Sequence, residues 1–311
     1  MIASFETLLP IFLLIALGLA LRAKDIVPEE MWRGLELLSY WVFFPALLTD
    51  TLARSNISNL PLTAVAATMI ASFFTMAIGL LIARNFIMRS MALSGPSYSS
   101  VFQSATRWNG FIALPILAKL YGDEGVALVA IIIGALIPVA NIMAVTVVAR
   151  NADSRRLSPR EVAYVVLRNP FVWSTALGLF INFLNIPIYA PIMTSLSLLG
   201  NAAIGPGLLM VGAGLSITDA RRPSGAVWLG TILKLVGTPI LVTVWSFLTG
   251  VEGTAYVACM ISAAVPTAMS AYVLARQIGG DAPLVASTLT VQTALSFLTI
   301  PLVMMVAEYL Q

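Results

Sequence analysis

Long apolar runs separated by short polar segments dominate this sequence. Most runs are about twenty residues long and carry almost no charge, which is the length that an α-helix needs to cross a hydrocarbon core of about 30 Å. Strands of a membrane barrel would instead alternate apolar and polar side chains. The pattern predicts membrane-spanning helices at residues 5–21, 35–53, 61–83, 97–120, 126–149, 171–188, 192–216, 225–248, 254–278 and 283–308. We therefore expect an all-α membrane protein with ten transmembrane helices.

Two of the predicted helices are interrupted near their middle. The fourth contains Asn109-Gly110, and the ninth contains Pro266-Thr267. Proline lacks the N–H that a helix needs and glycine is the most flexible residue, so both positions favour a break. Backbone groups freed by a break are costly in lipid unless a partner or a water-lined cavity satisfies them. Simple kinks, which proline and glycine often produce in membrane helices, are the alternative for either break taken alone.

The breaks occupy corresponding positions in two halves of the chain. An alignment that places Asn109 on Pro266 also matches other short segments in the same order. We predict one five-helix repeat at 1–149 and a second at 171–311, joined by a cytoplasmic linker at 150–170 with a short interfacial helix. Since five is odd, the second repeat is inverted in the membrane. Crossed broken helices in such repeats indicate a secondary transporter's binding site, and their half-helix N-termini suit an anion.

Composition excludes an ordinary soluble domain. Of the 311 residues 59% are hydrophobic and 10% are charged, and the mean hydropathy is +0.95. Most of the 17 basic residues fall in the odd-numbered loops, whereas the even-numbered loops carry only Arg54 and Lys119. The positive-inside rule then places both termini outside the cytoplasm. The net charge of +3 is spread over several membrane-flanking loops, so it reflects topology and predicts no nucleic-acid partner.

Several enzyme classes are excluded by missing residues. The chain has no histidine, which rules out a Ser/His pair, a histidine-ligated zinc site and a histidine-ligated haem. It has no glycine-rich phosphate loop for ATP and no acidic pair at mid-membrane. We therefore expect neither an enzyme nor a cofactor, and an unrecognised intramembrane enzyme is only a third alternative.

Two cations lie inside predicted helices. A cation at membrane depth costs about 2.5 to 3.5 kcal/mol on insertion scales, so Arg107 and Lys234 require an explanation. Either side chain can neutralise a substrate carboxylate. Alternatively, Arg107 lies nearer the cytoplasmic face, and Lys234 snorkels to the surface or pairs with an acid such as Asp50.

Four polar side chains near the breaks are further candidates for substrate binding. Asn141 and Gln292 are amides in the helices that follow the broken ones, and Thr267 and Ser270 follow Pro266 directly. The amides can bind a ligand or hold neighbouring helices together. The hydroxyls can donate to a ligand or to their own helix backbone.

Three segments carry a family resemblance: Arg107 to Pro115, Ala264 to Pro266, and Tyr272 to Arg276. Together they resemble the auxin efflux carrier family, which includes bacterial organic-acid permeases and the plant PIN-FORMED auxin carriers. The resemblance extends along essentially the whole chain. It departs from many plant members in having only a short link between helices five and six, and the third helix lacks an acidic residue that could couple protons.

The resemblance implies a ten-helix fold of two inverted repeats, akin to bile-acid and sodium/proton carriers. Helices 1, 2, 6 and 7 would form a scaffold that dimerises, and helices 3–5 and 8–10 would form a transport domain that moves as an elevator. The family's crossover asparagine and proline correspond to Asn109 and Pro266.

The sequence thus predicts a secondary active transporter or facilitator of small organic anions in a bacterial inner membrane. Carboxylates such as malate, malonate or an auxin-like acid fit this expectation, and coupling to a proton or to sodium is left open. The substrate site is expected at Asn109, Gly110, Pro266, Thr267, Arg107, Asn141, Gln292, Ser270 and Lys234. The alternative function is a ligand-gated channel or membrane sensor built on a carrier fold.

Overall fold

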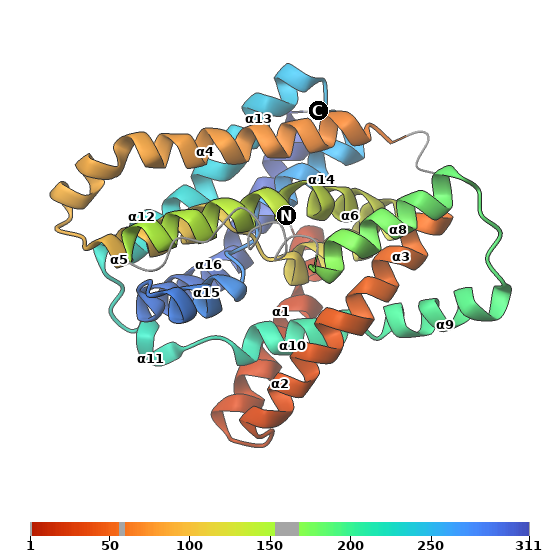
Figure 1. The fold of residues 1–311 in the computed structure, drawn as a ribbon, viewed down its shortest axis with the longest axis horizontal. Helices are drawn as coiled ribbons and strands as arrows, with labels where there is room; N and C mark the ends of the chain where they lie inside the picture. Colours follow the sequence, from red (N-terminus) through yellow and green to blue (C-terminus); the bar gives the residue numbers. More distant parts are fainter. Residues whose placement is uncertain (1, 56–59, 153–167, 311) are drawn as a thin grey trace. The chain divides into compact units, whose positions relative to one another are not determined.

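The computed structural model describes residues 2–55, 60–152 and 168–310, and these residues form helices without any strand (Figure 1). The predicted interfacial helix of the 150–170 linker falls almost wholly outside the described residues. The described chain divides into two compact units, each of which contains segments from both halves of the sequence. The compact units are therefore not the two sequence halves.

Unit 1 comprises Met1–Leu62, Gly110–Gly134 and Leu167–Gly214. Its elements are α1 (Ile2–Ala23), α2 (Glu29–Leu38), the π-helical turn η1 (Ser39–Phe43), α3 (Phe44–Arg54), the first part of α6 (Gly110–Asn151), α8 (Pro170–Phe183), α9 (Ala190–Asn201) and α10 (Ile204–Ala213).

Unit 2 comprises Thr63–Asn109, Ala135–Val166 and Leu215–Gln311. Its elements are α4 (Leu62–Ser90), α5 (Gly95–Thr106), the remainder of α6, α11 (Ile217–Ala220), α12 (Gly225–Ile232), the π-helical turn η3 (Leu233–Gly237), α13 (Thr238–Thr249), α14 (Gly253–Ala264), α15 (Ser270–Ile278) and α16 (Ala282–Tyr309).

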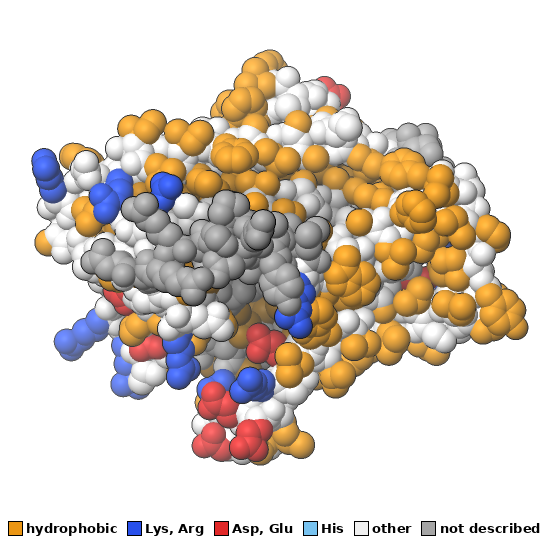
Figure 2. Space-filling model, in the orientation of Figure 1, with side chains coloured by type: hydrophobic (Ala, Val, Ile, Leu, Met, Phe, Trp, Pro, Cys, Tyr) orange, Lys and Arg blue, Asp and Glu red, His pale blue; other side chains and the backbone are white. Residues whose placement is uncertain are grey.

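Apolar helices dominate both units. Within the described ranges, five helical stretches are long and apolar enough to cross a membrane: Leu62–Ser90, Gly95–Asn151, Ala190–Ala213, Gly225–Thr249 and Ala282–Tyr309. Large hydrophobic side chains also cover much of the visible surface (Figure 2), and Phe247 is 89% exposed. Such exposure is unfavourable in water and suits lipid contact. The all-helical fold agrees with the predicted membrane protein, whereas the ten-helix inverted repeat remains a prediction.

Two of the differences between the helix boundaries and the predicted spans involve turns. The predicted loop between residues 120 and 126 shrinks to one non-helical residue, Gly122, whose φ of 54° is readily adopted by glycine. The predicted span 192–216 is divided into α9 and α10 by a short turn at Ala202 and Ala203. Local turn geometry, to which hydropathy is insensitive, decides both differences.

Glycines allow close helix packing in unit 1. A Cβ added at Gly212 of α10 would overlap the carbonyl oxygen of Ile15 in α1, and one at Gly18 of α1 would overlap that of Leu209. Small residues at such contacts let helix backbones approach, which is the usual basis of helix packing in membranes. These glycines therefore fix α1 against α10.

Hydrogen bonds join the starts of two helices in unit 2. Asp281 caps α16 by accepting from the Leu284 N–H at 3.1 Å, and its second oxygen accepts from the Ser97 hydroxyl of α5 at 2.8 Å. Ser100 Oγ, also in α5, donates to the Asp281 carbonyl and accepts from its N–H. The N-termini of α5 and α16 are thereby held together.

Candidate functional site

Both predicted interruptions occur as breaks in the helical backbone. Helix α5 ends at Thr106 and α6 begins at Gly110, while α14 ends at Ala264 and α15 begins at Ser270. Val265 is extended, with φ −68° and ψ 151°. The ring of a proline disfavours the helical conformation in the residue before it, so Pro266 explains the end of α14.

Arg107 lies in the first break and links three segments of unit 2. Only 8% of the residue is exposed. Its Nη2 donates to Asn141 Oδ1 in α6 and to Ser270 Oγ at the start of α15, both at 2.8 Å. Asn141 is half-buried and Ser270 is exposed, so this cluster extends from the interior of unit 2 to its surface. Three of the predicted site residues therefore meet here.

Gln292 of α16 connects the second break with two neighbouring helices. Its Oε1 accepts from the Thr267 N–H at 2.8 Å, and its Nε2 donates to the carbonyls of Ser104 and Gly230 at 3.1 Å each. In an uninterrupted α5 the Ser104 carbonyl would accept from an N–H four residues later. Gln292 thus satisfies two backbone groups that the breaks release, the Thr267 N–H and the Ser104 carbonyl, and it joins α16 to α12 through the Gly230 carbonyl.

A direct contact also joins the two breaks. The hydroxyl of Thr267 donates to the Gln103 carbonyl at 3.3 Å, and this carbonyl accepts from the Arg107 N–H at 2.9 Å. Pro266, Thr267 and Asn109 are all buried. Gly110, the first residue of α6, is half-buried and belongs to unit 1.

Lys234 is a buried cation in a π-helical turn. It lies in η3, which packs against α5, α14 and α16, and only 2% of it is exposed. Within the described residues its ammonium makes no hydrogen bond or ion pair. The proposed partner Asp50 instead accepts from Nε of Arg54 at 2.7 Å. Because the side chain does not reach the surface of the chain, snorkelling does not explain it either. A single π-helical turn within an α-helix, as here, is frequently found at functional sites.

Gln103 is a further candidate residue that the sequence-based prediction did not include. It is fully buried in α5, and neither its Nε2 nor its Oε1 has a hydrogen-bond partner among the described residues. The hydroxyls of Ser104 and Thr231 are also buried and have no hydrogen-bond partner among the described residues. Buried amides are almost always hydrogen-bonded, so an unpaired one requires an explanation. The sequence feature that could have pointed to Gln103 is its position as an amide within an apolar run, just before the break at Asn109.

Comparisons with known proteins agree along the whole chain. A profile of the membrane transport protein family matches residues 3–304. An "Uncharacterized transporter" from Methanothermobacter thermautotrophicus is 27% identical over 303 residues, which cover 96% of this chain and 97% of that protein. A "Putative malonate transporter" from Rhizobium meliloti is 26% identical over 304 residues, with 94% and 92% covered.

A plant relative matches a smaller part. "Auxin efflux carrier component 6" from Arabidopsis thaliana is 26% identical over 128 residues, covering 39% of this chain and 22% of the plant protein. The family match and the apolar helices together indicate a multi-pass membrane transporter rather than an enzyme. The resemblance identified from the sequence motifs is confirmed: the chain belongs to the membrane transport protein family that includes the auxin efflux carriers.

Proposed function

We propose that this protein is a secondary transporter of small organic anions whose substrate binds at the two helix breaks of unit 2. The observation that carries the proposal is the position of Arg107, which lies in one break and donates to Ser270 at the end of the other. A guanidinium is always charged and offers five N–H donors in a fork that matches a carboxylate. The name of the malonate relative supports a small carboxylate as substrate.

Helix termini add to the positive potential of the proposed site. Helix α15 begins at Ser270 without a side chain that caps it. The first N–H groups of a helix lack intrahelical partners and favour an anion. Asn141, Thr267 and Gln103 would then orient the substrate by neutral hydrogen bonds, while Gln292, whose amide already bonds three backbone groups, would hold the breaks in place.

Transport would proceed by alternating access without covalent chemistry. Helices 3–5 and 8–10 of the predicted topology would form the moving domain, and unit 2 contains most of the same segments, without residues 61–62 and 110–134. That agreement supports an elevator in which the breaks travel with the substrate. The scaffold helices would form a homodimer in a bacterial inner membrane, with both chain termini outside the cytoplasm. A proton and a sodium ion are the candidate coupling ions.

The decisive experiment is counterflow of labelled malonate and malate in proteoliposomes. Wild-type protein should show saturable exchange, and Asn109→Ala should abolish it while the protein remains folded. Asn201→Ala, which changes an exposed asparagine of α9 in unit 1, is the matched control. Undiminished exchange by the Asn109 variant would remove that residue from the site. Binding without exchange would favour the sensor, and unsaturable flux would favour the channel.

A further inference from the structure

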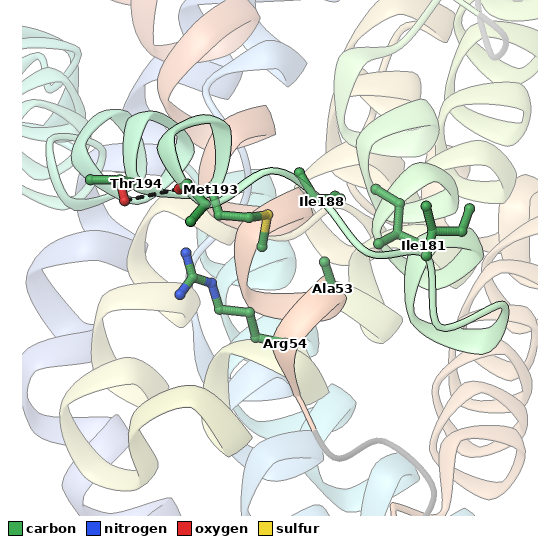
Figure 3. Close-up of a pocket in the computed structure, with 8 residues that line it drawn as sticks. Ala53, Arg54, Ile181, Ile188, Met193 and Thr194 are labelled. Atoms are coloured by element: carbon green, nitrogen blue, oxygen red, sulfur yellow. Dashed lines mark hydrogen bonds between the residues drawn. The ribbon is translucent and has the colours of Figure 1, made fainter.

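Unit 1 contains a pocket that shares no residue with the site proposed to bind the transported anion. Its volume is about 370 Å³, and it is formed by the ends of α3 and α8 and the start of α9 (Figure 3). The walls are mainly aliphatic, from Ile181, Ile186, Ile188 and Met193. Arg54 is the charged residue among the lining side chains.

Arg54 is oriented by an ion pair that leaves part of its guanidinium available. Nε donates to Asp50 Oδ1 at 2.7 Å, and Asp50 is the more buried partner, with side-chain exposures of 13% for Asp50 and 52% for Arg54. Figure 3 shows the guanidinium directed toward Met193 of α9. Its two Nη nitrogens make no hydrogen bond within the described residues. Four N–H donors therefore remain for a ligand anion.

The surroundings of the pocket place it at the edge of the hydrocarbon layer. Helix α3 ends at Arg54, α8 ends at Phe183, and the chain is non-helical until α9 begins at Ala190. Lipid-exposed irregular backbone is not tolerated inside the hydrocarbon core, so this connection belongs at the membrane–water interface. Tyr189 is 73% exposed in it, as is typical of aromatic residues at the headgroup level.

We propose that this pocket binds one anionic phospholipid, with the phosphate on Arg54 and the start of an acyl chain against the aliphatic wall. A small soluble anion would satisfy Arg54 but leave Ile181, Ile188 and Met193 without an apolar partner. A phospholipid satisfies both, because its phosphate is joined to hydrocarbon at the interface where the pocket lies. Phe183 and Leu184, which follow the lining residue Ile181 in the sequence, are exposed and offer apolar surface for the rest of the acyl chain.

The test is thermal unfolding of delipidated protein in detergent, titrated with phosphatidylglycerol or with phosphatidylcholine of identical acyl chains. Phosphatidylglycerol should stabilise the wild type more strongly. For Arg54→Gln we expect about tenfold weaker binding of phosphatidylglycerol, since a hydrogen bond to a charged group is lost. Arg22→Gln, which alters another exposed arginine of unit 1, should bind as the wild type does.

Two further measurements identify the ligand. Ile188→Trp should fill the pocket and weaken phosphatidylglycerol binding without a change of charge. Glycerol 3-phosphate, the headgroup chemistry without acyl chains, should give little stabilisation. Equal protection by glycerol 3-phosphate would replace the lipid with a soluble anion, and unchanged lipid binding in Arg54→Gln would overturn the proposal. Since the readout requires no transport, failure here and failure of the proposed transport function are distinguishable.

Discussion

The two units solve helix packing in different ways. In unit 1 the helices meet through glycines, such as Gly212 against the Ile15 carbonyl, and through aromatic rings. The ring of Phe44 lies 4.6 Å from that of Phe111 and 5.8 Å from that of Phe171, measured between centroids. Packing of this kind makes few demands on hydrogen bonding, and it suits a rigid framework.

Unit 2 instead buries polar side chains along its helix contacts. Ser99, Ser100, Gln103 and Ser104 are all fully buried on α5, and Gln292 is fully buried on α16. Among the described residues, most buried polar atoms without a partner belong to this unit. A polar interior rigidifies a protein only when fully paired. Unit 1 therefore packs mainly through small and aromatic side chains, whereas unit 2 buries polar side chains, several of them without a partner among the described residues.

We expect the largest loss of stability from Gln292→Leu, which removes hydrogen bonds that hold unit 2 together. The substitution removes the partner of the Thr267 N–H and of the Ser104 carbonyl, and one of the donors to the Gly230 carbonyl, which also accepts from the Leu233 N–H. Each buried group left unpaired costs about 1–3 kcal/mol, so the variant should unfold at clearly lower temperature or denaturant concentration. Gln277→Leu, at an exposed position of α15, is the control. A wild-type midpoint for Gln292→Leu would mean that these bonds do not hold unit 2 together.

Arg107→Gln should impair transport more than stability. Hydrogen bonds to a charged group contribute about 1.5–3 kcal/mol, so losing the charge at the substrate should lower initial uptake about tenfold or more. The measurement is uptake of labelled malonate into proteoliposomes. Arg89→Gln, on the exposed surface of α4, should transport normally. Equal rates for the two variants would separate Arg107 from the substrate.

Gly212→Ala tests the packing of unit 1. Overpacking of a close contact costs about 1–3 kcal/mol, and the new methyl group would meet the Ile15 backbone. Gly205→Ala provides a control on the same helix, because a Cβ there meets nothing within 4 Å. Thermal unfolding of both variants in one detergent makes the comparison. If the two glycines prove equally tolerant, α1 and α10 are not held by backbone proximity.

The smallest effect on stability is expected from Gln103→Leu. Replacing an unpaired buried amide by an apolar group of similar size should be neutral or stabilising by up to about 1 kcal/mol. Transport should nevertheless fall if the amide contacts the substrate. Stability and uptake are measured on the same preparation. A marked loss of stability would show that the amide has a structural partner.

Hydropathy predicted most of the helices, because a run of apolar residues is a local property of the chain. The errors of the hydropathy-based prediction also have local causes. The segment 171–188 ends as α8 at Phe183, and the turn at Gly122 hardly interrupts α6. In a long apolar stretch a left-handed glycine changes direction without changing hydropathy, so the pattern gives no sign of it.

Pairing of charges was less predictable than helix position. Asp50 was one candidate partner for Lys234, yet it pairs with Arg54 one turn along its own helix. That choice follows from the (i, i+4) spacing, which places two side chains on the same helix face. Lys234 lies in unit 2, whereas Asp50 lies in unit 1.

The sequence by itself determined that this is a helical membrane protein with two broken helices, since hydrophobic length and the backbone chemistry of proline and glycine act over a few neighbouring residues. Only the tertiary structure decided that Arg107 meets Asn141 and Ser270, that Gln292 satisfies the freed Ser104 carbonyl, and that the Gln103 amide has no partner among the described residues. Those outcomes depend on atoms that are far apart in the sequence. Whether two such atoms form a buried hydrogen bond depends on where the fold places them.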